Sequence, residues 1–169
     1  MDLLQQILST TSAVLVALFS VWAKEAWESR RKFHAIIRAL RDETKKNTAT
    51  AEQLRIQIGH GIDSMKNNRV YLEPYRRFCV SAWTLILNSG FLLRLDRDLI
   101  NILEETYAAI LTLNDFSKRV EEITFRPPDM EYSSVTKMII ANLEVMQKIL
   151  AKIEKLEQTQ RFLEKILDC

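Results

Sequence analysis

The sequence predicts an all-α protein in which an N-terminal transmembrane helix leads into an antiparallel up-and-down four-helix bundle. Residues 3–23 carry no charged side chain. Apolar residues recur at spacings of three and four along most of the remaining chain, which is the pattern of amphipathic helices. Three glycines and three prolines among 169 residues leave too few turns for a β-rich or α/β fold.

The first expected element is a membrane anchor at residues 1–28. A helix rises about 1.5 Å per residue, so the uncharged stretch would be about 30 Å long, which matches the hydrocarbon core of a bilayer. Residues 13–19 are wholly apolar, so no side of this helix is polar. Asp2 precedes the stretch and basic residues follow it, which places the C-terminal side in the cytoplasm by the positive-inside rule. We expect a single-pass protein of the cell inner membrane, with residues 29–169 as a cytosolic helical bundle.

Three other interpretations of this segment are open. A cleaved signal peptide would need a basic start, whereas this chain begins with Met1 and Asp2. A buried core helix of a soluble protein is compatible with residues 9–12, a Ser-Thr-Thr-Ser run that dilutes the apolar character. An interfacial helix would need a polar side, which residues 13–19 lack.

The first two cytosolic helices are expected to end at glycines. Apolar spacing continues from the anchor as far as Ile58, and the glycines of residues 59–61 are placed to end that helix. After a polar connector, Pro74 suits the first turn of a second helix, which Gly90 closes.

The third and fourth helices are expected to be long. Asp96 is a candidate N-cap for a helix that runs to about Ile123, ahead of two prolines at residues 127–128. The last helix is expected to start near Ser133 and to continue unbroken almost to the end. Its heptad repeat consists of Val135, Asn142, Ile149, Leu156 and Leu163. Such spacing is typical of coiled-coil-like packing in antiparallel bundles.

Four polar residues fall at or beside expected core positions: Glu43, Asn47, Asn114 and Asn142. Because buried polar groups need hydrogen-bond partners, we expect these four to meet in one polar layer across the bundle. The layer is interpreted as a device that sets helix register rather than as a ligand site.

No combination of residues predicts a reaction. The glycines are too few for a phosphate-binding loop or a dinucleotide fingerprint. Neither His34 nor His60 has the glutamate three residues earlier that di-iron bundles need. Cys79 and Cys169 lack neighbouring ligands at zinc spacing. We therefore expect no enzyme activity, catalytic residue, metal, cofactor or small-molecule substrate.

Basic charge is concentrated directly after the anchor. The formal net charge is +2, whereas residues 24–46 alone carry eight basic and four acidic side chains. A chain with this balance is not expected to bind nucleic acid. The basic residues next to the membrane are Lys24, Arg30, Arg31 and Lys32. They are expected to orient the anchor and to contact anionic lipid headgroups, each worth about 1 kcal/mol near the surface.

Self-association is also expected, with a dimer as the default because symmetric dimers are the commonest assembly. Ser9, Ala13 and Ala17 recur every four residues, and small residues at this spacing allow membrane helices to approach closely. The first and last helices should outrun the second, leaving part of the last helix uncovered. Leu156 and Leu163 are the expected oligomer contacts there.

Several features in the middle half of the chain form a loose pattern. Glu43 and Asn47 make a Glu-x-x-x-Asn turn. It is followed by Trp83, Ser89-Gly90, Leu95-Asp96, Tyr107 and Leu113-Asn114. This pattern resembles one in uncharacterised prokaryotic membrane-anchored helical-bundle proteins, and the resemblance implies a bundle behind an N-terminal anchor without implying an activity.

The expected function is therefore a non-enzymatic, membrane-anchored interaction or scaffold module that presents a helical bundle to an unknown protein partner. Two alternatives are open. One is a soluble all-α subunit of a larger assembly that buries the apolar N-terminus, and the other is a membrane-active effector or toxin.

Overall fold

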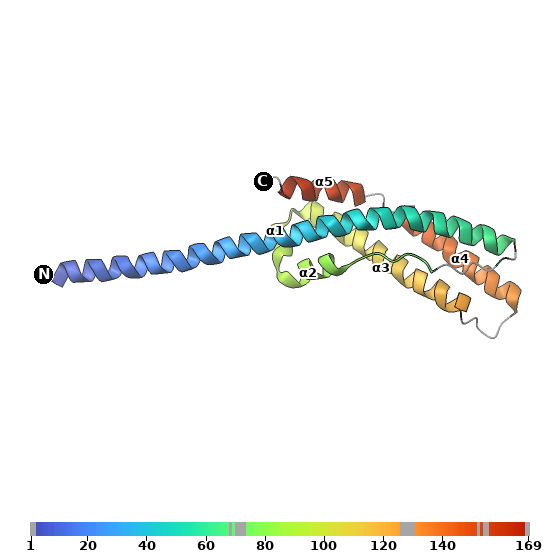
Figure 1. Ribbon diagram of the computed structural model, residues 1–169, viewed down its shortest axis with the longest axis horizontal. Helices are drawn as coiled ribbons and strands as arrows, with labels where there is room; N and C mark the ends of the chain where they lie inside the picture. Colours follow the sequence, from blue (N-terminus) through green and yellow to red (C-terminus); the bar gives the residue numbers. More distant parts are fainter. Residues whose placement is uncertain are drawn as a thin grey trace. The chain divides into compact units, whose positions relative to one another are not determined.

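The structure is a computed structural model that describes the backbone of residues 3–67, 69, 74–125, 131–151, 153 and 156–167. Within these ranges, the side chains of residues 3–11, 13 and 156–158 lie outside the description. All regular elements in the described ranges are helical, which confirms the all-α class (Figure 1). They are α1 (Leu3–Lys66), α2 (Ser81–Ser89), the 3-10 helix η1 (Phe91–Arg94), α3 (Arg97–Phe125), α4 (Tyr132–Leu150) and α5 (Leu156–Leu167).

The chain divides into two compact units, Met1–Ile36 and Ile37–Cys169. Unit 1 contains the first part of α1, and its described residues are all helical. Unit 2 contains the rest of α1 and the other helices. The sequence predicts a boundary between residues 28 and 29, whereas the compact second unit begins at Ile37.

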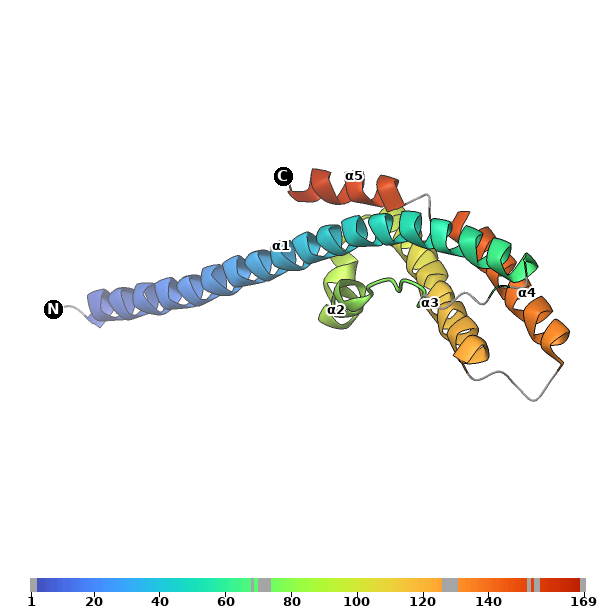
Figure 2. The ribbon, with the colours of Figure 1, turned by 45° about the vertical axis from the view of Figure 1, so that its right-hand side comes forward.

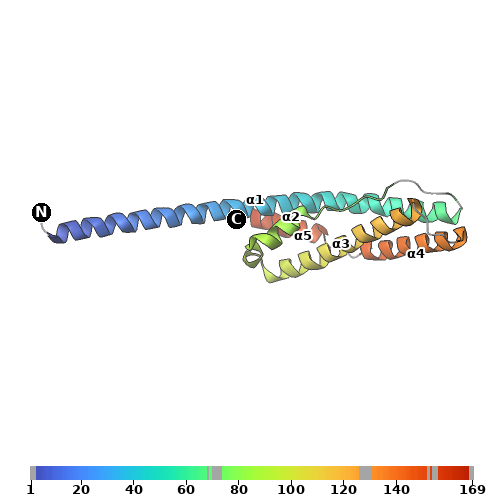
Figure 3. The same ribbon diagram turned by 90° about the horizontal axis from the view of Figure 1, so that it is seen from below.

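The core of unit 2 is built mainly by its three long helices. α3 and α4 pack side by side in opposite directions, and α5 packs against α3 (Figures 2 and 3). Most of the core side chains that are almost completely buried come from α1, α3 and α4, and Ile86 of α2 and Leu163 of α5 join them. They include Ile37, Leu40, Leu54, Ile58, Leu99, Leu103, Ile110, Leu113, Leu143 and Met146. Their spacing of three and four is the amphipathic pattern seen in the sequence.

α1 does not end at the predicted glycines but continues through them to Lys66. Gly61 is buried, and a Cβ atom at this position would lie 2.6 Å from Tyr75 Oη and 3.1 Å from Leu143 Cδ1. The missing side chain therefore allows close packing and does not mark a helix end. The space around Gly59 is open.

The predicted second helix is wrong in its first half. Residues 74–80 are not helical, and α2 begins only at Ser81. We call residues 74–80 the connecting segment; Figure 1 shows it in green leading into α2. Its backbone hydrogen bonds go to side chains of α1 and α3, as described below. The predicted end of α2 is confirmed, because Gly90 has the left-handed φ of 73° that favours glycine.

α3 begins where the sequence predicts. The side chain of Asp96 accepts a hydrogen bond of 2.8 Å from the Asp98 N–H, which satisfies one of the free donors at a helix N-terminus.

The predicted unbroken last helix is wrong. α4 ends at Leu150 and α5 begins at Leu156. Residues 151–155 contain neither glycine nor proline, so the local sequence carries no strong helix-breaking signal. The separate α5 packs against α3 and buries Thr159 and Leu163.

Candidate functional site

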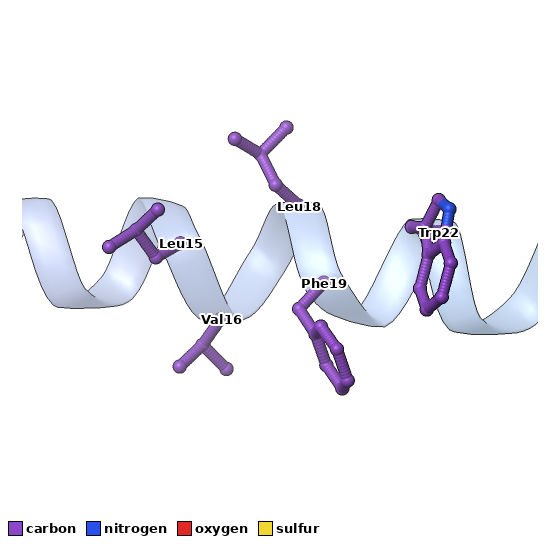
Figure 4. A pocket seen from close by; sticks show the side chains of 5 residues that line it. All are labelled: Leu15, Val16, Leu18, Phe19 and Trp22. Atoms are coloured by element: carbon purple, nitrogen blue, oxygen red, sulfur yellow. The ribbon is translucent and has the colours of Figure 1, made fainter.

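Unit 1 exposes a broad apolar surface. The large apolar side chains between residues 14 and 22 are each more than half exposed, namely Val14, Leu15, Val16, Leu18, Phe19, Val21 and Trp22. Five of them line a shallow surface pocket, and Leu18 points away from the side to which Val16 and Phe19 point (Figure 4). Apolar side chains therefore cover more than one side of this helix. An exposed apolar surface of this extent is typical of a membrane or protein contact.

Among the described residues, no helix is long and apolar enough to cross a membrane. The side chains of residues 3–11 and of Ala13, which belong to the predicted anchor, lie outside the description. The predicted close-approach residues Ser9 and Ala13 are among them, whereas Ala17 is described and exposed.

Aromatic and basic side chains follow the apolar surface along α1. The rings of Phe19 and Trp22 lie 5.8 Å apart. The guanidinium of Arg31 lies 5.7 Å from the centre of the Trp27 ring, within the range of a cation–π contact. All four predicted headgroup contacts, Lys24, Arg30, Arg31 and Lys32, are exposed. Amphipathic aromatic rings beside basic residues are characteristic of a membrane–water interface.

In unit 2, Glu43 of α1 caps the N-terminus of α2. Its buried carboxylate accepts hydrogen bonds from the backbone N–H groups of Ala82 at 2.8 Å and Trp83 at 3.3 Å, and from Ser81 Oγ at 3.3 Å. These N–H groups have no partner within the first turn of a helix, where the helix dipole also favours a negative charge. Glu43 therefore supplies from another helix the cap that Val80, the residue before α2, does not provide.

Tyr107 of α3 completes the set of donors around Glu43. Its hydroxyl donates a hydrogen bond of 2.8 Å to Glu43 Oε1, and its ring stacks on Trp83 with centroids 5.0 Å apart. Burial raises the pKa of Tyr107 far above its ordinary value, and the neighbouring carboxylate of Glu43 raises it further. The tyrosine hydroxyl therefore remains a donor throughout the physiological range.

Two asparagines bind successive residues of the connecting segment through both amide atoms. Asn47 Oδ1 accepts from the Cys79 N–H and Asn47 Nδ2 donates to the Cys79 carbonyl, each at 2.8 Å. Asn114 makes the same pair of bonds with Phe78, at 2.8 and 3.0 Å. Asn47 comes from α1 and Asn114 from α3. Each side chain pairs with both the N–H and the carbonyl of one residue, as the backbone of a neighbouring β-strand would do.

Two further side chains bind the start of the connecting segment. Gln57 of α1 accepts from the Arg76 N–H at 3.1 Å and donates to the Pro74 carbonyl at 3.3 Å. Glu121 of α3 accepts from the Tyr75 N–H at 3.2 Å and pairs with the Arg77 guanidinium. We call Glu43, Asn47, Gln57, Tyr107, Asn114 and Glu121 the polar cluster.

The structure brings together three of the four residues of the predicted polar layer. Glu43, Asn47 and Asn114 all bind the backbone between Phe78 and Trp83. The placement of Asn142 in this layer is corrected, because its amide donates to the Met138 carbonyl one turn earlier in α4.

Sequence reasoning missed Gln57, Tyr107 and Glu121 as members of the polar cluster. A signal was present on α3, where Tyr107, Asn114 and Glu121 recur every seven residues and so lie on one side of the helix. On α1, Gln57 follows Glu43 by two heptads, with Thr50 at the position between them.

The predicted exposed stripe on the last helix is also corrected. Leu163 and Ile153 are buried within the chain, because α5 folds against α3 instead of extending α4. Leu163 is therefore not available as an oligomer contact. The side chain of Leu156 lies outside the described residues.

The polar cluster is chemically suited to holding the fold. Groups of this chain occupy both oxygens of Glu43 and both amide atoms of Asn47 and Asn114. Within the described ranges, no group of three or more His, Cys, Asp or Glu side chains could hold a metal ion.

Comparison with known proteins adds no assignment, since no family model, curated protein or solved structure matches this chain.

Proposed function

We propose that this chain is a non-enzymatic, membrane-anchored helical module that presents unit 2 to a protein partner at the cytoplasmic face of the inner membrane. The observation that carries the proposal is the exposed apolar surface of α1 between residues 14 and 22. It lies within a stretch of 21 residues without charge, and basic residues follow it.

A bilayer accounts for three properties of unit 1 together. The uncharged stretch is about 30 Å long as a helix, the thickness of a hydrocarbon core. Its described apolar side chains point to more than one side, as lipid contact on all sides requires. Trp22 and Trp27 stand beside Lys24 and Arg31, which is the arrangement found at membrane interfaces. The positive-inside rule then favours a cytoplasmic unit 2.

The polar cluster supports a structural, non-catalytic role for unit 2. Its carboxylate and amide groups are occupied by the connecting segment and the start of α2. A catalytic carboxylate needs access to a substrate, whereas Glu43 is buried and surrounded by donors from its own chain.

The second candidate is a subunit of a larger assembly whose partner covers the apolar part of unit 1. The observation that favours it is the same exposed apolar surface of residues 14–22, which a protein partner would cover as well as a bilayer. The predicted homodimer stays a prediction, and its contacts would have to exclude the buried Leu163.

Carbonate extraction of membranes from expressing cells tests the anchor. We expect the full chain to stay in the membrane pellet. A Val16→Lys/Phe19→Lys double variant should move to the supernatant, since each lysine near the centre of a membrane helix costs about 2.5–3.5 kcal/mol. The matched control is Ile56→Lys/Leu93→Lys, which replaces exposed apolar residues of unit 2 and should stay in the pellet. Release of the unmodified chain by carbonate would contradict the anchor and favour the soluble assembly.

A further inference from the structure

Lys24, Trp27 and Arg31 lie on one side of α1. Residues spaced by three and four are neighbours on one side of a helix, and all three of these side chains are exposed. The contact between the Arg31 guanidinium and the Trp27 ring, at 5.7 Å, joins two members of this stripe directly. We call these three residues the interfacial stripe.

The other two basic residues of this region point elsewhere. Successive residues of a helix are rotated by about 100°, so Arg30 and Lys32, which flank Arg31, project to either side of the interfacial stripe. No ion pair within the described part of the chain neutralises Lys24, Arg30 or Lys32. The region therefore offers four cations and two exposed carboxylates, Glu25 and Glu28, for a net charge of +2, and two of the cations stand beside an exposed indole ring on one side.

We propose that the interfacial stripe binds the headgroups of anionic phospholipids and tilts the anchor toward that side. The proposal rests on the membrane anchor proposed above and adds the side of the helix that contacts the anionic headgroups and the tilt that this contact causes. The occupant is the phosphate-bearing surface of a bilayer, since an indole ring beside a guanidinium fits the boundary between headgroups and hydrocarbon.

The length of the stripe is the reason for the tilt. Seven residues separate Lys24 from Arg31, which is about 10 Å along the helix axis. The headgroup layer of one leaflet is only about 5–8 Å thick. A helix along the membrane normal would carry Arg31 beyond this layer, whereas a tilt of about 40°, the upper end of the range for membrane helices, shortens the separation of the two cations along the normal to about 8 Å and keeps both within the layer. Interfacial aromatic and basic anchors set helix tilt in this way.

The strength of the effect follows from the charges. A basic side chain near an anionic surface changes partition toward that surface by about fivefold. Because Lys24 lies in the headgroup layer in either orientation, Arg31 alone favours the tilted state, by about fivefold on anionic over neutral membranes.

Trp27 is the natural reporter of this contact. The full chain with Trp22→Phe and Trp83→Phe retains Trp27 as its remaining tryptophan. We would reconstitute it into vesicles of phosphatidylcholine, with and without phosphatidylglycerol, and measure quenching of Trp27 fluorescence by aqueous acrylamide. The quenching constant should fall by at least about twofold when phosphatidylglycerol is present.

Two matched double variants distinguish a lipid contact on one side of the helix from a general attraction of basic residues to anionic lipid. Lys24→Gln/Arg31→Gln should abolish the protection by phosphatidylglycerol. Arg30→Gln/Lys32→Gln, which removes the same charge from the other sides of the helix, should retain it. Flotation of the vesicles is recorded in parallel.

Equal quenching in the two kinds of vesicle, with the protein floating in both, would overturn the stripe and leave the anchor intact. An equal loss of protection in both double variants would overturn the sidedness. Failure of the chain to float with either kind of vesicle would overturn the anchor and the stripe together.

Discussion

Asn47 and Asn114 carry out a task that is usually left to the backbone. A carboxamide offers one donor and one acceptor in nearly the same arrangement as a peptide group. Each asparagine uses both of them to satisfy one residue of the connecting segment. The backbone of Phe78 and Cys79, which lies in neither a helix nor a sheet, is therefore paired, whereas each unpaired buried group would cost about 1–3 kcal/mol.

The first prediction concerns Asn47→Leu, which removes both hydrogen bonds to Cys79. Because the Cys79 N–H and carbonyl would lose their partner, the free energy of unfolding should fall by about 1–3 kcal/mol. Denaturant titration of the full chain in a mild detergent, followed by circular dichroism, measures this change. Asn142→Leu is the control, since Asn142 bonds only within α4, and it should stay within about ±0.5 kcal/mol. An equal fall in the free energy of unfolding in the two variants would show that the hydrogen bonds between Asn47 and Cys79 do not stabilise the fold more than a bond within one helix.

At the scale of elements, α1 and the connecting segment show how long-range contacts override local pattern. Tyr75, Phe78, Ala82 and Ile86 have the spacing of a helix, and all four are buried. The first two nevertheless lie in the connecting segment, because partners on α1 and α3, more than 30 residues away, bind its backbone. The same spacing can therefore fill a core from a non-helical segment followed by a helix.

The second prediction concerns the two glycines inside α1. Gly61→Ala would place a Cβ atom 2.6 Å from Tyr75 Oη, so Tyr75 or the helix must shift. We expect a loss of about 1–3 kcal/mol in the free energy of unfolding, the usual cost of overpacking a core. Gly59→Ala meets no atom within 4 Å. It should stabilise the protein by about 0.5–1 kcal/mol, because alanine favours a helix over glycine.

Thermal melts of the two alanine variants beside the unmodified chain would measure the difference. Opposite signs are the expected result. If Gly61→Ala were as stable as Gly59→Ala, the close approach of Tyr75 to α1 would be refuted.

The sequence predicts those elements whose ends are set by local chemistry. Asp96 and Gly90 act through hydrogen bonds and backbone angles of their own neighbourhood, and both lie where they were expected. The break between α4 and α5 has no such signal, because it depends on packing against α3. Half of the polar cluster was predicted for a related reason. Glu43, Asn47 and Asn114 interrupt apolar stripes, whereas Gln57 and Glu121 show only heptad spacing from other members of the polar cluster until the connecting segment is placed.

At the scale of the whole molecule, the described core lies in unit 2 apart from Ile36, the last residue of unit 1. Among the described side chains, none before Ile36 is buried. The polar cluster and the close packing at Gly61 also lie entirely within unit 2. We therefore expect unit 2 to fold without the apolar surface of unit 1.

The third prediction follows from this separation. A fragment that begins at Arg30 should fold alone as a soluble, mostly helical domain, since its helices bury one another. Circular dichroism and size-exclusion chromatography of the purified fragment provide the measurement. Low helicity or immediate aggregation would show that the preceding residues belong to the core.

Loops usually tolerate substitution better when they carry no function, and residues inside helices are constrained mainly where they are apolar and buried. Here the connecting segment is bound through its backbone, so the constraint falls on polar residues inside helices. The Cys79 amide and carbonyl are held by Asn47, while the Cys79 side chain is exposed. Because Asn47 binds only the backbone at position 79, we expect any residue with an N–H and a carbonyl to be tolerated there. The exposed Cys79 thiol is suited to chemical labelling. The residues that cannot be changed without losing these hydrogen bonds are instead Asn47 and Asn114, which lie inside regular helices and not in the segment that they bind.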